Sequence, residues 1–238
     1  MIHLADAVRA STPNLAARLG RPERDIQVIG NALDERIWFP DRRRLVSPYE
    51  PVRLLLMGTA THDADFAMIL PALSELQRQL GHRARIDMIG FAAMTAVPDW
   101  IRRVPVPAHA ARSYAGFVHW ITRAGPWDIG LAPLADSPFN ACKSPIKTLD
   151  HAALSLATLA SDVAAYQGSI ADGTGGILVE NTTAAWYEAM SRLVRDDALR
   201  QALAEGGLAR VRETGTLEAQ AGAWRRAWPR TGKRRAAG

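Results

Sequence analysis

The apolar residues of this chain alternate between short continuous runs and longer segments in which they recur every three or four positions. Continuous runs are typical of parallel strands buried on both faces, and the longer spacing is typical of amphipathic helices. The runs that predict strands lie at 52–57, 86–90, 104–106, 128–134, 157–161 and 177–179. The helical spacing covers 66–80, 114–121, 145–156, 186–194 and 199–211. Strands that alternate with helices predict an α/β fold built on a Rossmann-like, doubly wound parallel sheet with right-handed crossovers.

A smaller unit precedes this sheet. We expect a short strand within 4–11, a helix capped by Ser11 or Thr12 with Pro13 in its first turn, and a second short strand at 26–29. The polar segment between the two units contains prolines and three consecutive arginines, which indicates a linker. The expected division of the chain is 1–40, a linker at 41–51, the main unit at 52–224 and a basic tail at 225–238.

The net charge of +5 is concentrated in that tail. The last 14 residues hold six of the 29 lysines and arginines and none of the 24 acidic residues, which leaves 23 basic and 24 acidic side chains elsewhere. A nearly neutral body does not favour a nucleic-acid partner, and the tail is expected to be solvated and disordered. The alternative is a weak contact between the tail and an anionic membrane surface.

The cysteine count and the hydropathy indicate the compartment. Cys142 is the single cysteine, so an internal disulfide is not possible, which favours a reducing cytoplasm. No run of about 18 uninterrupted apolar residues predicts a membrane span, and the first ten residues lack the apolar core of a secretory leader. We therefore expect a cytoplasmic protein, peripheral at the inner membrane face if the tail binds lipid.

The segment 139–153 combines a strand end, two lysines and a helix start. Ser144 suits the N-cap of that helix and Pro145 its first position. The free N–H groups of the first turn, together with Lys143 and Lys147, predict a phosphate or diphosphate site. Asp150 lies one turn further along, where its carboxylate can accept hydrogen bonds from sugar hydroxyls. The alternative is a capped surface helix with two solvated lysines.

The turn that follows 52–57 is the second candidate for ligand contact. Gly58 and Thr59 allow the backbone to approach a ligand, and His62 can reach an anionic group. The turn matches neither a P-loop nor a Gly-x-Gly-x-x-Gly fingerprint, and the alternative for His62 is a polar residue at a helix start. The six histidines and Cys142 show no metal-ligand spacing, and no residue of this chain stands out as catalytic.

The order of these motifs resembles the C-terminal, donor-binding half of GT-B glycosyltransferases, of the family 4-like, bacterial cell-surface polysaccharide type. The most specific part is 127–153, which resembles the signature W-D-I-G-L-A-P-L followed by F-N-x-x-K-S-x-I-K-x-L-E-Y-A-A. Further matches lie at 5–16, 28–34, 55–62, 176–179 and 193–203. The resemblance implies that 1–40 is a remnant of the family's N-terminal domain and that 52–224 is a Rossmann-like donor-binding domain.

The resemblance also implies a nucleotide-sugar site. In the family's Glu-x7-Glu motif the second acid binds the nucleotide ribose, and Asp150 occupies that place. The first acid falls at Cys142, so its contact with the donor sugar is absent or taken over by Lys143. The backbone that follows Lys143 would hold the diphosphate. The donor-binding residues implied by the resemblance and by the residue types are Gly58, Thr59, His62, Lys143, Ser144, Pro145, Ile146, Lys147 and Asp150.

The implied activity is transfer of a hexosyl group from a nucleotide-diphosphate sugar to a saccharide or lipid-linked acceptor. The resemblance implies retention at the anomeric carbon, no metal, no cofactor besides the donor substrate, and a separate acceptor-binding subunit or domain. The alternative function is a non-catalytic nucleotide-sugar binding or assembly module. A nicotinamide-dependent epimerase would need a Tyr-x-x-x-Lys pair and a dinucleotide fingerprint, and the sequence has neither.

Overall fold

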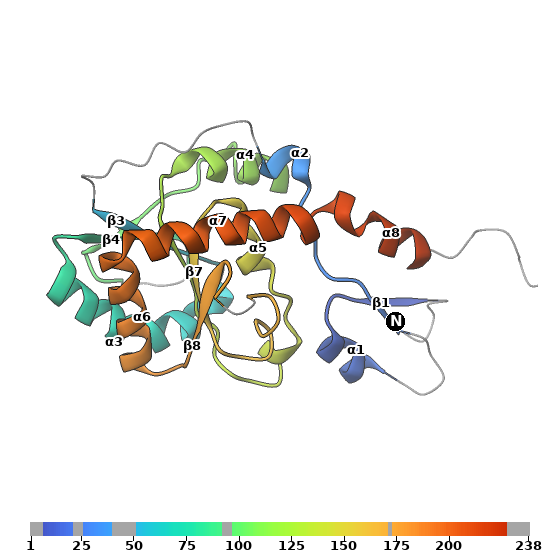
Figure 1. Ribbon diagram of the computed structural model, residues 1–238, viewed down its shortest axis with the longest axis horizontal. Helices are drawn as coiled ribbons and strands as arrows, with labels where there is room; N and C mark the ends of the chain where they lie inside the picture. The colour runs from blue at the N-terminus through green and yellow to red at the C-terminus, as the bar shows by residue number, and fades with distance from the viewer. Residues whose placement is uncertain (1–6, 21–25, 40–50, 92–96, 171–172, 228–238) are drawn as a thin grey trace, which may run out of the picture.

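The computed structural model describes residues 7–20, 26–39, 51–91, 97–170 and 173–227. Its centre is a six-stranded sheet in the order β5-β4-β3-β6-β7-β8, in which all neighbouring strands run parallel (Figure 1). The strands are β3 (Val52–Gly58), β4 (Ala84–Gly90), β5 (Ile101–Arg103), β6 (Ile129–Ala132), β7 (Ala157–Ser161) and β8 (Gly176–Val179). The strand order confirms the parallel α/β sheet that the apolar runs predict.

The residues of β3 show how the sheet is covered on both faces. Leu54 and Leu56 pack in one core cluster with α3 (Asp63–Leu80) and α6 (Thr183–Arg195). Leu55 and Met57 point to the other face, where α4 (Tyr114–Ala124) and α5 (Ile146–Ala153) cover them. Because side chains alternate across a strand, a strand buried on both faces reads as one continuous apolar run. The doubly wound arrangement is therefore confirmed. The helix α7 (Asp197–Thr214) packs against α5 and β7.

Two local predictions are wrong. The edge strand is β5 at Ile101–Arg103 and not 104–106, because Val104 N–H donates the last ladder bond to the Met88 carbonyl (2.9 Å) and Pro105 has no N–H to continue it. The helix α5 begins at Ile146, after Pro145 in the cap position, and it ends at Ala153. Within the described residues, no side-chain hydrogen bond caps α5, so Ser144 does not act as its N-cap. Thr148 Oγ1 instead donates to the Pro145 carbonyl (2.8 Å). Two short 3-10 turns, η2 (Ala60–His62) and η3 (Asn140–Cys142), precede α3 and α5.

The N-terminal unit is a two-stranded parallel sheet of β1 (Val8–Ala10) and β2 (Ile26–Val28) with α1 (Pro13–Leu19) between them. Thr12 caps α1 through a hydrogen bond from Leu15 N–H (3.1 Å), as predicted. The short helix α2 (Glu35–Trp38) then packs on α4, where Trp38 Nε1 donates to the Tyr114 hydroxyl (2.9 Å).

The C-terminal helix α8 (Leu217–Ala227) extends away from the sheet toward the N-terminal unit (Figure 1). Hydrogen bonds pair Leu33 with the entry to this helix: Leu33 N–H donates to the Gly215 carbonyl, and Leu217 N–H donates to the Leu33 carbonyl. The boundary drawn at 224 falls inside α8. Residues 40–50, most of the expected linker, and 228–238, most of the basic tail, lie outside the described residues. Among the helices of the described ranges, none is long and apolar enough to cross a membrane.

A buried carboxylate ties β4 to the adjacent edge strand. Asp87 is 1% exposed and accepts hydrogen bonds from Arg102 Nε (2.7 Å) and Trp127 Nε1 (2.7 Å). Replacing Arg102 by Ala leaves this carboxylate with one donor. We expect a loss of about 2 kcal/mol in unfolding free energy, the usual cost of an undersatisfied buried polar group. Urea denaturation measures it. The control is Arg85→Ala, at an exposed position of β4, the strand that contains Asp87. Its unfolding free energy is expected to stay within about 0.5 kcal/mol of the wild type. Equal losses in both variants would show that Arg102 does not stabilise the Asp87 carboxylate.

Candidate functional site

The predicted donor-binding residues gather at the carboxyl ends of β3 and β6. A polar network fixes the loop that leaves β6: Leu134 N–H donates to Ser161 Oγ (2.8 Å), Ser161 Oγ donates to Asn181 Oδ1 (2.7 Å), and Asn181 Nδ2 donates to the Leu134 carbonyl (3.0 Å). The carboxyl ends of β6, β7 and β8 are thereby held together. In parallel sheets, ligands bind in the crevice beyond this edge.

Lys147 projects from the first turn of α5 onto the end of β3. Its Nζ donates a hydrogen bond to the Met57 carbonyl (2.5 Å). Burial lowers the pKa of Lys147 to about 8, against the opposing effect of Asp150 and Asp65, which favour the charged form. The ammonium group therefore lies in poorly hydrated surroundings beside the N–H groups that begin α5. An anion placed there gains from both the cation and the helix terminus.

Asp150 lies one turn further along α5. Its Oδ1 is buried and has no hydrogen-bond partner among the described residues. Burial raises the pKa of Asp150 to about 7, and the charge of Lys147 opposes this rise. Buried polar atoms in folded proteins are nearly always paired, so an orphaned carboxylate oxygen at a sheet edge fits a site that a hydroxyl-bearing ligand completes.

Lys143 lies in the loop before α5, on the N-terminal side of Lys147 and Asp150. Its Nζ lies 5.4 Å from the ring centroid of Phe139, whose side chain is 74% exposed. Ser144, Pro145 and Ile146 follow it as half-buried residues that lead into the first turn of α5. The structure thus brings the two lysines and Asp150 to one short stretch, although the helix begins later than predicted.

The turn after β3 has a packing role in addition to the predicted one. A Cβ atom at Gly58 would come within 2.5 Å of the Phe91 ring, so close packing against this ring requires glycine at 58 whether or not a ligand binds. Thr59 is exposed, and its Oγ1 lies 3.0 Å from Thr61 Oγ1. Ligand contact by Gly58 and Thr59 stays a prediction.

His62 is held by a residue that the sequence analysis missed. Its Nδ1 lies 2.6 Å from Oδ2 of Asp65, and Asp65 Oδ1 accepts a hydrogen bond from Ala135 N–H (2.7 Å). Burial of Asp65 acts to raise the pKa of this carboxyl. The hydrogen bonds from His62 and Ala135 and the charge of Lys143 outweigh it, so the pKa lies below its usual range. The spacing of three residues between a histidine and an acid was the signal available in the sequence.

His151 is a second residue that the sequence analysis missed. It is fully buried, neither ring nitrogen has a hydrogen-bond partner among the described residues, and burial lowers its pKa to about 3. The ring lies against Gly130 of β6, where a Cβ atom would come within 2.5 Å of His151 Cγ. His151 therefore fixes the distance between α5 and the sheet, and through it the positions of Lys147 and Asp150.

The N-terminal unit touches the same loop. Thr12 Oγ1 donates to the Cys142 carbonyl (3.0 Å), and Asn14 Nδ2 donates to the Ala141 carbonyl (2.9 Å). Cys142 itself is partly exposed. Within the described ranges no group of three or more histidine, cysteine or acidic residues is arranged to hold a metal ion.

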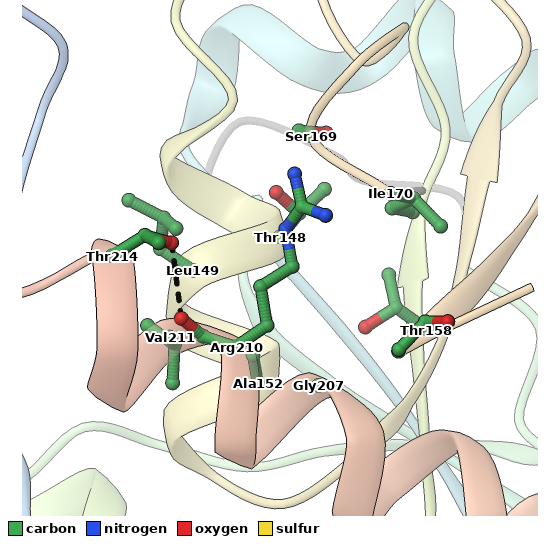
Figure 2. Close-up of a pocket in the computed structure, with 12 residues that line it drawn as sticks. Thr148, Leu149, Ala152, Thr158, Ser169, Ile170, Gly207, Arg210, Val211 and Thr214 are labelled. Atoms are coloured by element: carbon green, nitrogen blue, oxygen red, sulfur yellow. Dashed lines mark hydrogen bonds between the residues drawn. The ribbon is translucent and has the colours of Figure 1, made fainter. Parts of the chain in front are cut away.

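A small pocket lies on another side of α5, between this helix, α7 and Ser169 (Figure 2). Its volume is about 30 Å³, which is room for a water molecule and not for a nucleotide. Thr158 lines it with a buried hydroxyl that has no partner among the described residues, and Arg210 Nη2 donates to the Gly168 carbonyl (3.0 Å). The arrangement fits a bound water.

The sequence matches no protein-family model and no curated protein. The structure is similar to sucrose-phosphate synthase from Thermosynechococcus elongatus, at 15% identity and a TM-score of 0.62, over 93% of this chain and 58% of that one. It is similar to HepE from Anabaena in a complex with UDP and glucose, at 11% identity and a TM-score of 0.67, over 94% and 64%.

The C-terminal domain of the group 1 glycosyl transferase LpcC from Francisella tularensis is also similar, at 16% identity and a TM-score of 0.54. The match covers 78% of this chain and 99% of that domain. The chain spans about three fifths of the first two structures, 58% and 64% of their length. At these identities the likeness shows the fold, which is that of the C-terminal half of a GT-B glycosyltransferase.

Proposed function

We propose that this chain binds a nucleotide-diphosphate sugar and supplies the donor half of a hexosyl transfer. The diphosphate lies at the start of α5 against Lys143 and Lys147, and the ribose hydroxyls donate to Asp150. The observation that carries the proposal is the buried, unpaired Oδ1 of Asp150, one turn from a poorly hydrated lysine at a helix N-terminus. In this proposal a ribose hydroxyl pairs with the Asp150 oxygen, and the diphosphate of the same ligand pairs with the lysine.

Two further observations support the proposal. The GT-B fold is shared with structures of HepE in complexes with UDP and with UDP-glucose. Lysine ammonium groups and a helix N-terminus would stabilise the negative charge that develops as a diphosphate leaves, and such electrostatic stabilisation is the largest single contribution to many transfer reactions. In the transfer, the bond from the anomeric carbon to the diphosphate oxygen breaks, a bond to an acceptor hydroxyl oxygen forms, and the hydroxyl proton passes to the released diphosphate.

The acceptor is proposed to bind on a separate domain or subunit. The described part of the N-terminal unit is a two-stranded sheet with one helix, which packs on the loop that carries Lys143. A domain that extends this unit would face the carboxyl edge of the main sheet. The saccharide or lipid-linked nature of the acceptor remains part of the proposal.

Calorimetric titration with UDP, UDP-glucose, GDP and GDP-mannose tests the donor site. We expect one nucleotide to bind, and we expect Asp150→Ala to weaken its binding about tenfold, because a hydrogen-bonded contact to an ionised group is lost. Circular dichroism confirms that the variant is folded. The matched control is Asp196→Ala: Asp196 caps α7 through Leu199 N–H and is exposed. No binding of any of the four by the folded chain would overturn the proposal.

A further inference from the structure

We infer that His62, oriented by Asp65, accepts a hydrogen bond from a hydroxyl group of the sugar that is transferred, and that Asp65 is the positioning residue for this contact. The inference rests on the proposed donor site and names the part of the nucleotide sugar that lies at the β3–α3 turn. It distinguishes a sugar contact from the phosphate contact that a histidine at this position also suggests.

Asp65 sets the tautomer of the imidazole. This residue is 3% exposed, and its two oxygens are each engaged, one by Ala135 N–H and the other by His62 Nδ1. An ionised carboxylate only accepts hydrogen bonds, so the proton of the imidazole lies on Nδ1. With that proton on Nδ1, the neutral form of the ring presents a lone pair on Nε2, which can accept a hydrogen bond from a donor such as a sugar hydroxyl.

The other ring nitrogen is available to a ligand. Nε2 has no hydrogen-bond partner in the described part of the chain and is not among its buried unpaired atoms, and the side chain is 14% exposed. His62 is thus fixed on one side by a buried carboxylate and open on the other at the carboxyl edge of the sheet. A histidine that only began a helix would not need a buried acid on Nδ1.

The charges around the site place the sugar at this end. The charge of Lys147 interacts with both Asp150 and Asp65, and the charge of Lys143 acts on Asp65, so both acids lie within electrostatic range of a lysine. In a nucleotide sugar the diphosphate likewise joins the ribose to the sugar. With the ribose at Asp150 and the diphosphate at the lysines, the sugar falls beside the pair of His62 and Asp65.

The first turn of α3 favours a neutral group over an anion. Asp63 and Asp65 both lie in this turn, and Oδ1 of Asp63 is buried without a partner among the described residues. Two carboxylates offset the positive end of the helix dipole and disfavour a phosphate there. By contrast, the first turn of α5 contains no acidic residue. The anionic part of the ligand therefore belongs at α5 and the hydroxyl-rich part at α3.

Paired titrations of the full chain test the inference. Affinities for UDP and UDP-glucose, or for GDP and GDP-mannose if the chain binds guanine nucleotides, are measured for the wild type, His62→Ala, Asp65→Asn and the control His82→Ala. His82 is exposed in the turn between α3 and β4, at the opposite edge of the sheet. We expect His62→Ala to weaken binding of the nucleotide sugar by about five- to tenfold, which is the loss expected for one hydrogen bond. Binding of the free nucleotide is expected to weaken by less than about twofold. The control is expected to change neither affinity.

Asp65→Asn separates positioning from folding. The amide presents one oxygen and one NH₂ group. If the oxygen continues to accept from Ala135 N–H, the NH₂ donates to His62 Nδ1 and moves the imidazole proton to Nε2. We expect the nitrogen-15 spectrum of the His62 ring to report the exchanged tautomer, and the preference for the nucleotide sugar to fall as in His62→Ala. A spectrum and a preference that both stay at the wild-type values overturn the role of Asp65.

The two proposals fail in different ways. If no nucleotide binds the wild type, the donor site itself is wrong. If the free nucleotide binds and His62→Ala weakens it as much as the nucleotide sugar, His62 contacts the phosphate, and the inference is wrong while the donor site stands.

Discussion

Replacement of Lys147 by methionine is expected to weaken nucleotide-sugar binding by about 100-fold, since truncating one partner of a poorly hydrated charge pair costs about 2–5 kcal/mol. The ammonium group donates to the Met57 carbonyl, and Lys147 lies in the first turn of the helix that the diphosphate would approach. Methionine keeps an unbranched apolar stem that is one heavy atom shorter and removes the charge, so the loss reports mainly electrostatics. The measurement is calorimetric titration with UDP-glucose.

The pH dependence of the same binding identifies the charge. Because burial lowers the pKa of Lys147 to about 8, the free protein begins to lose this proton at a pH where the complex still retains it, since the bound diphosphate stabilises the ammonium form. Binding then takes up a proton, so affinity decreases as pH rises. Between pH 7.5 and 9 we expect a decrease of about eightfold in the wild type and no such decrease in Lys147→Met.

The ligand and the control are chosen for this comparison. The diphosphate of UDP-glucose has no proton to lose in this pH range, whereas that of UDP titrates near pH 6, so the nucleotide sugar reports the protein alone. Arg83→Met is the matched control, because Arg83 is exposed at the opposite edge of the sheet. A loss below about threefold in Lys147→Met, with a pH profile equal to that of the wild type, would show that the diphosphate does not bind at α5.

The strands of the main sheet were predictable because burial on both faces leaves a direct record in the sequence. Leu54, Leu55, Leu56 and Met57 are buried alternately in two clusters, which requires an uninterrupted apolar run. The edge strand β5 is paired on one side and has one buried residue, Ile101, so its apolar pattern is weak. The apolar residues at 104–106 therefore predicted the strand in the wrong place. The start of α5 was misplaced because Ser144 and Pro145 suit a helix N-terminus in isolation, whereas the preceding loop is fixed by contacts with β7 and β8.

The candidate site was predictable to the extent that it is local in the sequence. Lys143, Lys147 and Asp150 lie within eight residues: the three-residue spacing of Lys147 and Asp150 places them on one face of α5, and Lys143 lies just before this helix. Asp65 was not identified because an acid in a first helical turn normally complements the helix dipole, and its partner Ala135 is 70 residues away. His151 was missed for a similar reason, since a histidine on an apolar helix face gives no sign of the glycine it packs against.

Gly130→Ala is expected to lower the free energy of unfolding by about 3 kcal/mol, at the upper end of the cost of overpacking a core. The new Cβ would come within 2.5 Å of His151 Cγ. Relief requires movement of a ring that is fully buried or of β6, which pairs with β3 and β7. For a chain of this size the midpoint of thermal unfolding is expected to fall by roughly 6–12 °C. Gly222→Ala is the control: in α8 the added Cβ meets the end of the Arg226 side chain at 3.3 Å, and alanine favours the helix, so stability is expected to rise slightly.

The double variant Gly130→Ala with His151→Ala shows whether the ring is the cause. If the two side chains collide, the combined loss is smaller than the sum of the single losses by about 2 kcal/mol, and additive losses would contradict the contact.

The pH dependence of stability tests the burial of His151 independently. The unfolded chain protonates this histidine near its ordinary pKa of 6.5, while burial lowers the pKa of the folded state to about 3. The unfolded state therefore binds the extra proton below pH 6.5, and stability falls with decreasing pH. Between pH 7.5 and 5 the wild type should lose about 2 kcal/mol more than His151→Ala, which has no such group to leave unprotonated.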